Sequence, residues 1–319
     1  MSANAKSWLR FAIRRWPQIL LFVAALWLTF TTDRFYTGSN LSSILTRAAI
    51  VGVLAVGQCC VLLAGGFDLS QGANVGLACA VAGTAMTKGY DSGTCFIAAL
   101  STGILVGIVN GIFVAKLGTN PFVTTLSGLM VVKGLTFIVL GGLTLNKLTM
   151  FAALDRKVEV AGVGLSGRAA VFILATTIIW IFLRQTLWGQ HLRATGGNAE
   201  AARLAGVRTD RMKILSFALS GLCAGLASVL LLSFVKVSKT DTANGYELDS
   251  IASCVIGGVS LAGGDGSVLG AAAGCLMLKT IETIITLRGL DDQYRSLVTG
   301  ALILTFAATD AWASRGRRK

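Results

Sequence analysis

Ten apolar stretches, separated by polar linkers, constrain the fold of this chain more than any other feature of its sequence. Several have the ~20 residues that a tilted helix needs to cross the hydrocarbon core of a bilayer, and the others are shorter. We therefore predict an all-α fold, a polytopic transmembrane helical bundle of about ten spans. The stretches lie at about residues 17–32, 44–64, 69–87, 95–115, 121–141, 169–187, 213–234, 250–262, 267–287 and 296–313.

The composition supports a membrane protein. Hydrophobic residues make up 54% of the chain and charged residues only 13%, whereas a soluble domain carries about 25% charged residues. The 38 glycines suit transmembrane helices that pack closely through small residues. A net charge of +13 could indicate nucleic acid binding, but the charges lie in loops and at segment ends. We therefore predict contact with membrane lipid and no nucleic acid partner.

Enzymatic chemistry has little support in the sequence. The seven cysteines fall in or beside apolar segments without a C-x-x-C pattern, which favours small apolar packing residues over disulfides or metal ligands. The only histidine, His191, lies in a basic loop, so no nucleophile and base can be paired. No phosphate-binding loop occurs either. We predict no metal site, no catalytic residue and no ATP hydrolysis by this chain alone.

The distribution of charge predicts the orientation. With ten spans both termini lie on one side, which then carries fifteen Lys and Arg residues and four acids. The other side carries eleven Lys and Arg residues, diluted by nine acids. Because the more basic side faces the cytoplasm, we expect both termini there. The predicted organisation is a cytoplasmic tail (1–16), a transmembrane domain (17–313) and a basic cytoplasmic tail (314–319), with a first span that is retained rather than cleaved.

Two short apolar segments, 69–87 and 250–262, border paired glycines and are candidates for broken or re-entrant helices. The pairs are Gly65-Gly66 and Gly263-Gly264, and each ends a Leu-Ala-Gly-Gly sequence. This recurrence indicates either an internal repeat or chance in an Ala- and Gly-rich chain. Asp68 and Ser70 could cap the next helix, but an ionisable residue near membrane depth also suggests a joint that lines a path or meets a partner.

A long basic loop at about 188–212 contains a second type of signal. Residues 199–205 favour helix strongly, with Asn198 as the N-cap and Gly206 at the C-terminal stop. Two turns of helix with small residues and flanking arginines would form a compact knob. That knob could fit a groove of a soluble partner, or it could be a solvated linker helix, and the residues alone do not decide between these hypotheses.

Three further polar features lie within the spans. Asn120 as N-cap and Pro121 at the first helical position predict a helix start. Lys133, two-thirds along that span, must meet water or a partner group. Lys279 and Glu282 are three residues apart and can pair on one helix, and Asn110 could bond between helices. Two sets of glycines at a spacing of four residues predict closely packed helix faces. They are Gly103, Gly107 and Gly111, and Gly266, Gly270 and Gly274.

Five stretches of the chain, in this order, resemble the signature stretches of the permease subunits of the ribose/galactose/xylose-type bacterial ATP-binding cassette importers. They are residues 65–70, 120–122, 192–208, 261–264 and 266–270. The resemblance covers about residues 40–310. It implies a multi-pass protein of the bacterial inner (cytoplasmic) membrane that translocates a sugar or similar polar solute. Gln71, Phe67 and Lys133 depart from the residues common in the family, which weakens any assignment of the solute.

The resemblance also implies partners. These are a cytoplasmic ATPase that binds ATP and Mg, a periplasmic solute-binding protein, and a second permease copy, either identical or a close paralogue. The implied ATPase-coupling residues are Gly196, Gly197, Asn198, Glu200, Ala201, Ala202, Gly206 and Arg208. Candidates for the translocation path and its hinges are Gly65, Gly66, Asp68, Ser70, Asn120, Pro121, Thr124, Lys133, Gly263 and Gly264.

Two other classes of function compete with an importer subunit. An ion-gradient-driven secondary transporter would need carboxylates at membrane depth, for which only Glu282 and Asp68 are candidates. A structural or signalling membrane subunit that carries no flux is the third hypothesis.

Overall fold

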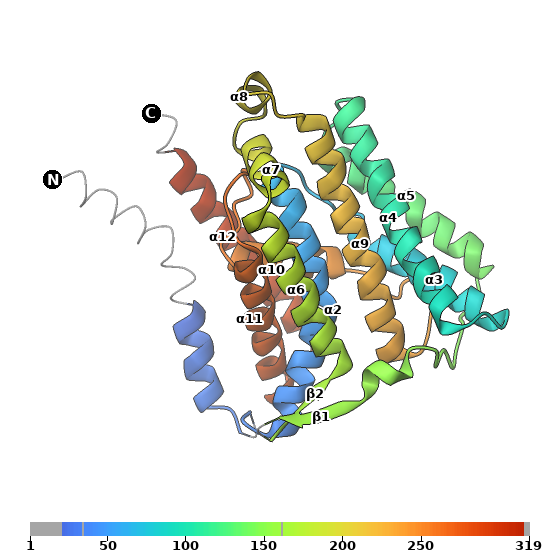
Figure 1. The fold of residues 1–319 in the computed structure, drawn as a ribbon. Coiled ribbons are helices and arrows are strands. Elements are labelled where there is room, and N and C mark those ends of the chain that lie inside the picture. Colours follow the sequence, from blue (N-terminus) through green and yellow to red (C-terminus); the bar gives the residue numbers. More distant parts are fainter. Residues whose placement is uncertain (1–20, 34, 161, 316–319) are drawn as a thin grey trace.

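The computed structural model describes residues 21–33, 35–160 and 162–315. The predicted N-terminal tail, the first residues of the first span and the last four residues of the basic tail lie outside this part of the chain. Figure 1 shows a bundle of helices with α7 and α8 at one end and a small β-hairpin at the other. The described fold is all-α apart from that hairpin.

Each predicted apolar stretch corresponds to a helix in the described residues. An apolar helix at Leu21–Phe30 covers most of the first stretch. The following elements are α2 Gly38–Leu63, α3 Gln71–Thr87, α4 Ser92–Lys116, α5 Pro121–Leu140, η1 Ala152–Asp155, β1 Lys157–Val160, β2 Val163–Ser166, α6 Gly167–Gln185, α7 Leu187–Gly197, α8 Ala199–Leu204, α9 Thr209–Val235, α10 Tyr246–Ile256, α11 Val268–Leu287 and α12 Asp292–Arg315.

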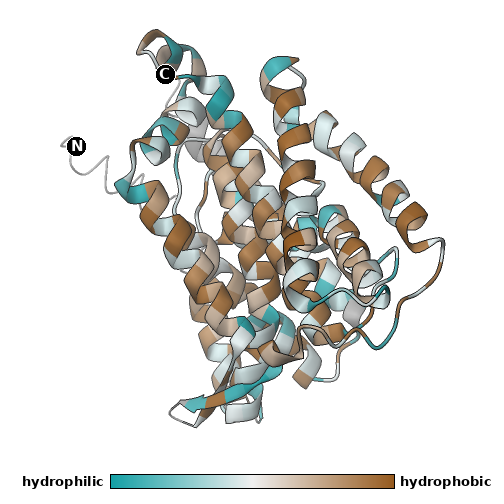
Figure 2. Ribbon diagram, turned by 45° about the vertical axis from the view of Figure 1, so that its right-hand side comes forward, coloured by the Kyte–Doolittle hydropathy of each residue, from teal (hydrophilic) through white to brown (hydrophobic). Residues whose placement is uncertain are grey.

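Six helices within the described residues are long and apolar enough to cross a bilayer: α2, α4, α5, α6, α9 and α11. Figure 2 shows hydrophobic residues along the middle of the bundle and hydrophilic ones at its two ends, which is the pattern that a bilayer requires. A polytopic membrane protein is therefore confirmed. The finer prediction of ten spans is not settled by helix length and composition.

The two segments predicted to be broken or re-entrant do form short helices. α3 has 17 residues, and α10 has 11, which is about 16 Å at 1.5 Å per residue. A helix as short as α10 covers only about half of a ~30 Å hydrocarbon core. The loops that contain the glycine pairs connect α2 to α3 and α10 to α11. The chain thus runs from a long helix to a short one at the first joint, and from a short helix to a long one at the second.

Two elements were not predicted. The hairpin of β1 and β2 lies in the loop expected at 142–168 and pairs in antiparallel register from Lys157 with Ser166 to Val160 with Val163. It is fixed to α2, because Ser42 Oγ donates to the Gly164 carbonyl oxygen at 2.6 Å. Helix α7 precedes the predicted knob. Its glycines disfavour a helix on propensity, and tertiary packing overrides that preference.

The core of the bundle is built on α9, which packs against both α2 and α4. A Cβ added at Gly103 or Gly107 on α4 would overlap backbone atoms of α9 around Gly221. The predicted close-packing face of α4 is therefore confirmed, and so is that of α11, where Gly270 and Gly274 meet the end of α10 at Gly257. All seven cysteines are buried and free, in agreement with their predicted packing role.

Candidate coupling and translocation site

Three glycine pairs that are far apart in the sequence meet at one end of the bundle. The Cα of Gly196, at the end of α7, lies 3.4 Å from the position of a Cβ on Gly65. A Cβ on Gly263 would lie 2.7 Å from the Gly196 carbonyl oxygen and 2.9 Å from the Gly65 Cα, and one on Gly264 would lie 2.7 Å from the Gly197 Cα. We call this contact the glycine junction, made of 65–66, 196–197 and 263–264.

The glycine junction is a contact between backbones, and at Gly196, Gly263 and Gly264 it leaves no room for a side chain. A Cβ on Gly196 would overlap the Leu63 carbonyl oxygen, which also accepts a hydrogen bond from the Gly264 amide at 3.1 Å. Gly65 and Gly263 have φ values of +80° and +92°, which only glycine adopts at low cost. Arg193 on α7 adds a side-chain tie by donating to the Gly266 carbonyl oxygen at 2.8 Å.

The predicted knob is α8. Asn198 is its N-cap and accepts from the Glu200 and Ala201 amides at 3.1 and 3.0 Å, which confirms the predicted cap. Gly206 follows the helix with φ +85°, as expected at a C-terminal stop. The knob projects from the bundle, and most of its surface is exposed; Leu204 is 84% exposed. Among the predicted coupling residues on α8, only Ala202 is buried, so it supports the knob from inside.

Asp68 lies at the centre of a buried polar network near the start of α3. One carboxylate oxygen accepts from the Ser70 amide and hydroxyl at 3.0 and 2.6 Å, and the other accepts from the Ser220 hydroxyl on α9 at 2.6 Å. The predicted capping of α3 differs in detail, because Ser70 occupies the N-cap position without a side-chain capping bond. Asn110 on α4 donates to Ser70 Oγ at 2.8 Å, which confirms its predicted role between helices.

Gln71 extends this network to α2 and α10. Its Nε2 donates to the Leu54 carbonyl oxygen at 3.2 Å and to Ser220 Oγ at 2.8 Å, while its Oε1 accepts from the Ser250 hydroxyl at 2.8 Å. Asp68 and Gln71 together fix the start of the short helix α3 against four other helices. Because a buried polar group without a partner is costly, this network holds α3 at one depth and one rotation.

The predicted helix start at α5 is also confirmed, but it lies away from the centre. Asn120 is the N-cap, accepting from the Phe122 amide at 2.9 Å, and Pro121 is the first helical residue. Thr124 bonds only locally, to Thr119 Oγ1 and the Asn120 carbonyl oxygen. The neighbouring Thr125, which sequence reasoning missed, is buried and donates to the Phe67 carbonyl oxygen in the first joint at 3.3 Å.

Lys133 meets a partner group, as its position within a span requires. Its Nζ donates to Asn244 Oδ1 at 2.8 Å, in the loop before α10. Glu247, on the first turn of α10, lies near that loop and packs against Gly72 of α3, where a Cβ would overlap its carboxylate. Lys133 and Glu247 therefore place opposite charges around the start of α10, although the two residues come from different helices.

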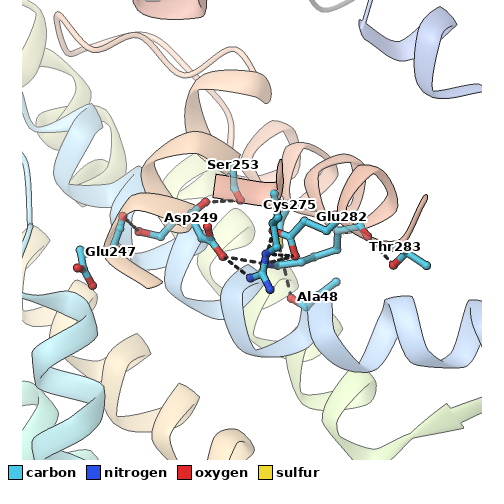
Figure 3. A network of polar contacts seen from close by, with 10 residues as sticks. Ala48, Glu247, Asp249, Ser253, Cys275, Glu282 and Thr283 are labelled. Carbon is cyan, nitrogen blue, oxygen red and sulfur yellow. Dashed lines mark hydrogen bonds and ion pairs between the residues drawn. The ribbon is translucent and has the colours of Figure 1, made fainter. Parts of the chain in front are cut away.

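A second charged group links α10, α11 and α12. Lys279 Nζ lies 2.8 Å from Asp249 Oδ2 and 2.8 Å from Glu282 Oε1, and all three residues are buried. Arg295 completes the group with contacts of 3.4 Å to Asp249 and 3.0 Å to Glu282. Figure 3 shows Asp249 and Glu282 close together, while Glu247 lies apart. The pairing of Lys279 with Glu282 is confirmed. The two extra members, Asp249 and Arg295, were not predicted, and their opposite charges keep the group neutral.

Several residues that bond at these sites could not be recognised from the sequence, because no pattern among their neighbours marks them. Ser220 and Ser250 are each one of several hydroxyl residues in otherwise apolar helices, and Arg193 is one of many basic residues in its loop. Asp249 and Arg295 stand where a loop charge is expected. Within the described residues, no group of three or more His, Cys, Asp or Glu side chains could hold a metal ion.

A bundle of apolar helices with two short helices, and an exposed helical knob next to both joints, is an arrangement expected of a transport permease. A family model described as the permease component of the branched-chain amino acid transport system matches residues 40–307. The chain therefore belongs to this family of permease components. It is a multi-pass protein of the bacterial inner membrane and a permease subunit of an ATP-binding cassette importer.

Curated relatives agree with this assignment. The ribose import permease protein RbsC of Bacillus subtilis is 31% identical over 294 residues, which cover 92% of this chain and 91% of the relative. The L-arabinose permease protein AraH of Azospirillum brasilense is 32% identical over 294 residues, covering 91% and 85%. The galactose/methyl galactoside import permease protein MglC of Escherichia coli is 28% identical over 329 residues, covering 98% of each. No solved structure matches the chain.

These findings confirm the resemblance on which the importer hypothesis was based. The relatives are import permeases, and they give no support to an ion-gradient-driven transporter. They are also not ATPases. The role of each candidate site residue is not tested by likeness to other proteins and stays a prediction.

Proposed function

We propose that this chain is the membrane-spanning subunit through which an importer moves a monosaccharide or a similar polar solute. The relatives named for ribose, L-arabinose and galactose support a sugar. The observation that carries the mechanism is the glycine junction. It joins the exposed coupling segment, mainly by backbone contact, to both joints that flank the short helices α3 and α10.

The driving subunit is a separate cytoplasmic ATPase, which binds ATP and Mg. The exposed surface of α8 supports docking, because an apolar side chain such as Leu204 projects into water at its tip. Beside it, a cavity of about 450 Å³ is lined by Arg203, Arg208 and neighbouring residues, and it could receive a segment of the partner. The proposed coupling residues remain Gly196, Gly197, Asn198, Glu200, Ala201, Gly206 and Arg208. Ala202 supports them from inside.

The transport cycle follows from these connections. ATP binding draws the two ATPase subunits together and displaces α8 with the end of α7. Since Gly196 has no space to move independently of Leu63 and Gly264, the displacement reaches both joints at once. The short helices then shift relative to the long ones, and the path opens alternately to each side. The path and hinge candidates near this route are those on the two joints, together with Lys133 beside α10.

The remaining partners and the topology complete the proposal. A periplasmic binding protein delivers the solute at the end that carries the hairpin, and a second copy of this subunit, or a close paralogue, completes the pore. Ten spans with both termini in the cytoplasm fit the charge distribution. The described end of α12 supports this topology, because it lies at the same end of the bundle as α7 and α8 (Figure 1).

Reconstitution tests the proposal directly. The subunit is placed in liposomes with the ATPase and the binding protein, and uptake of labelled ribose, arabinose and galactose is measured with ATP or with an ion gradient. We expect uptake only with ATP and both partners present. Uptake that is driven by a gradient and indifferent to ATP would contradict the importer mechanism, and uptake of none of the three sugars would rule these three out as the solute.

Charge reversal on the knob tests the docking surface. We expect Glu200→Arg to weaken association with the ATPase at least about tenfold, because it brings a new cation to an interface at which an exposed carboxylate stood. Co-purification and binding measurements in detergent report the association. Glu159→Arg is the matched control, since it makes the same change on the hairpin at the opposite end. Equal association of both variants with the ATPase would refute the assignment of α8.

A further inference from the structure

A polar cavity lies beside the glycine junction, between the end of α6, helix α7 and the start of α11. Its volume is about 340 Å³. Four polar residues line it: Arg184, Gln190, Arg193 and Ser267. Among the described residues, no carboxylate lines it. Ser267 is the N-cap of α11 but makes no side-chain capping bond, so its hydroxyl is not used in capping the helix.

The two arginines are held in place. Arg193 donates to the Gly266 carbonyl oxygen at 2.8 Å through Nη1. Arg184 lies over the ring of Trp180, with its Cζ 5.3 Å from the ring centroid. A guanidinium presents five donors in a planar fork, so these single contacts leave further donors for a ligand. Two arginines at one cavity, with no acid among its described lining residues, favour an anion, and a guanidinium fork matches the oxygens of a phosphate.

The position of the cavity identifies the source of the phosphate. Arg184 lies in the last turn of α6, one of the helices long enough to cross the bilayer, and Trp180 lies one turn further in. Tryptophan at the end of a span is typical of the headgroup layer. Deeper in the bilayer, α6 exposes Ile173, which lies two turns before Trp180 on the same side of the helix, and Ile181 beside that side, with 56% and 41% of their surfaces accessible. A cationic cavity that continues into an apolar helix face matches a ligand with an anionic head and acyl tails.

We propose that this cavity binds the phosphate headgroup of an anionic membrane phospholipid, such as phosphatidylglycerol. Basic pockets between transmembrane helices recognise anionic headgroups by charge and by hydrogen bonds to phosphate oxygens. The bound lipid ties α6, α7 and α11 together next to the glycine junction. The proposal does not depend on which solute the permease carries, and it holds for either orientation of the chain in the bilayer.

Lipid retention by the intact, purified subunit tests the proposal. The protein is titrated with phosphatidylglycerol in detergent, and native mass spectrometry and thermal unfolding report binding. We expect saturable binding that raises the unfolding temperature, with no such effect from phosphatidylcholine. Arg184→Gln should weaken the binding about fivefold, the contribution expected of one basic residue at a membrane surface. Arg184→Lys should retain most of the binding, since it keeps the charge.

Arg211→Gln is the matched control, because Arg211 is exposed near the same end of the bundle and does not line this cavity. Arg184 is itself exposed, so its replacement leaves the core packing intact, and a single symmetric chromatographic peak verifies this. Equal losses for Arg184→Gln and Arg211→Gln would overturn the proposal, as would equal binding of phosphatidylcholine. If inorganic phosphate alone raised the unfolding temperature as much as phosphatidylglycerol does, the cavity would be assigned to a free anion and the lipid assignment would be overturned.

Discussion

Replacing Lys279 with methionine is expected to destabilise the permease by about 3–5 kcal/mol, the usual result of removing one member of a buried ion pair. The ammonium group lies 2.8 Å from Asp249 and 2.8 Å from Glu282, and both carboxylates are buried. Without Lys279, Arg295 is the only cation of the group, and it faces two carboxylates. The substitution weakens the contacts between α10, α11 and α12. Thermal unfolding in detergent, followed by the loss of the monodisperse chromatographic peak, measures it.

Two further variants separate loss of charge balance from loss of packing. Lys239→Met is the matched control, because Lys239 is exposed in a loop, and little change is expected. Adding Asp249→Asn to Lys279→Met restores a neutral group, since one cation then faces one carboxylate, and part of the stability should return. If the double variant were as unstable as the sum of both single changes, the neutral charge balance would not be the source of the stability.

Gly196→Ala is expected to reduce ATP-driven solute uptake at least about tenfold while ATP hydrolysis by the assembled importer continues. The added methyl group would overlap the Leu63 carbonyl oxygen and lie 2.8 Å from the Gly264 amide nitrogen. Backbone atoms cannot rotate away as a side chain can, so the coupling segment must separate from both joints. Movement of α8 would then no longer reach α3 and α10. Uptake and hydrolysis are measured on the same proteoliposomes.

Gly197→Ala provides an unusually close control. It adds the same methyl group to the next residue, where nothing lies within 4 Å of the new Cβ. We expect near-normal uptake, and both variants should associate with the ATPase because the exposed face of α8 is unchanged. Equal uptake by Gly196→Ala and the unsubstituted protein would disprove mechanical transmission through the glycine junction. A loss of both hydrolysis and association would instead place the defect in docking.

Features that depend on neighbouring residues in the chain could be predicted. Asn120 and Asn198 were recognised as N-caps because the capping bond is local, and Lys279 with Glu282 because a helix brings residues three apart together. The apolar stretches predicted the helices for the same reason. Hydrophobic length decides whether a segment can lie in lipid, whatever the segment packs against.

Features that depend on the tertiary arrangement could not be predicted. Asp249 is 30 residues from Lys279 in the chain, and no periodicity connects them. The contact of Gly196 with Gly65 and Gly263 requires the relative positions of three loops. Thr124 was chosen beside the correct helix start, but the structure turns its neighbour Thr125 toward the first joint. Such choices depend on which face of a helix meets the core, and an evenly apolar membrane helix does not show that face in its sequence.

The glycine junction also bears on how permeases of this kind diverge. Its contacts are made by main-chain atoms, which are the same in every protein, so no side chain there can be altered to suit a different cargo. Mutations that change what is carried must therefore accumulate at side chains outside the junction. Solute specificity can then change in evolution while the coupling to the ATPase is conserved, because different atoms of the molecule carry the two properties.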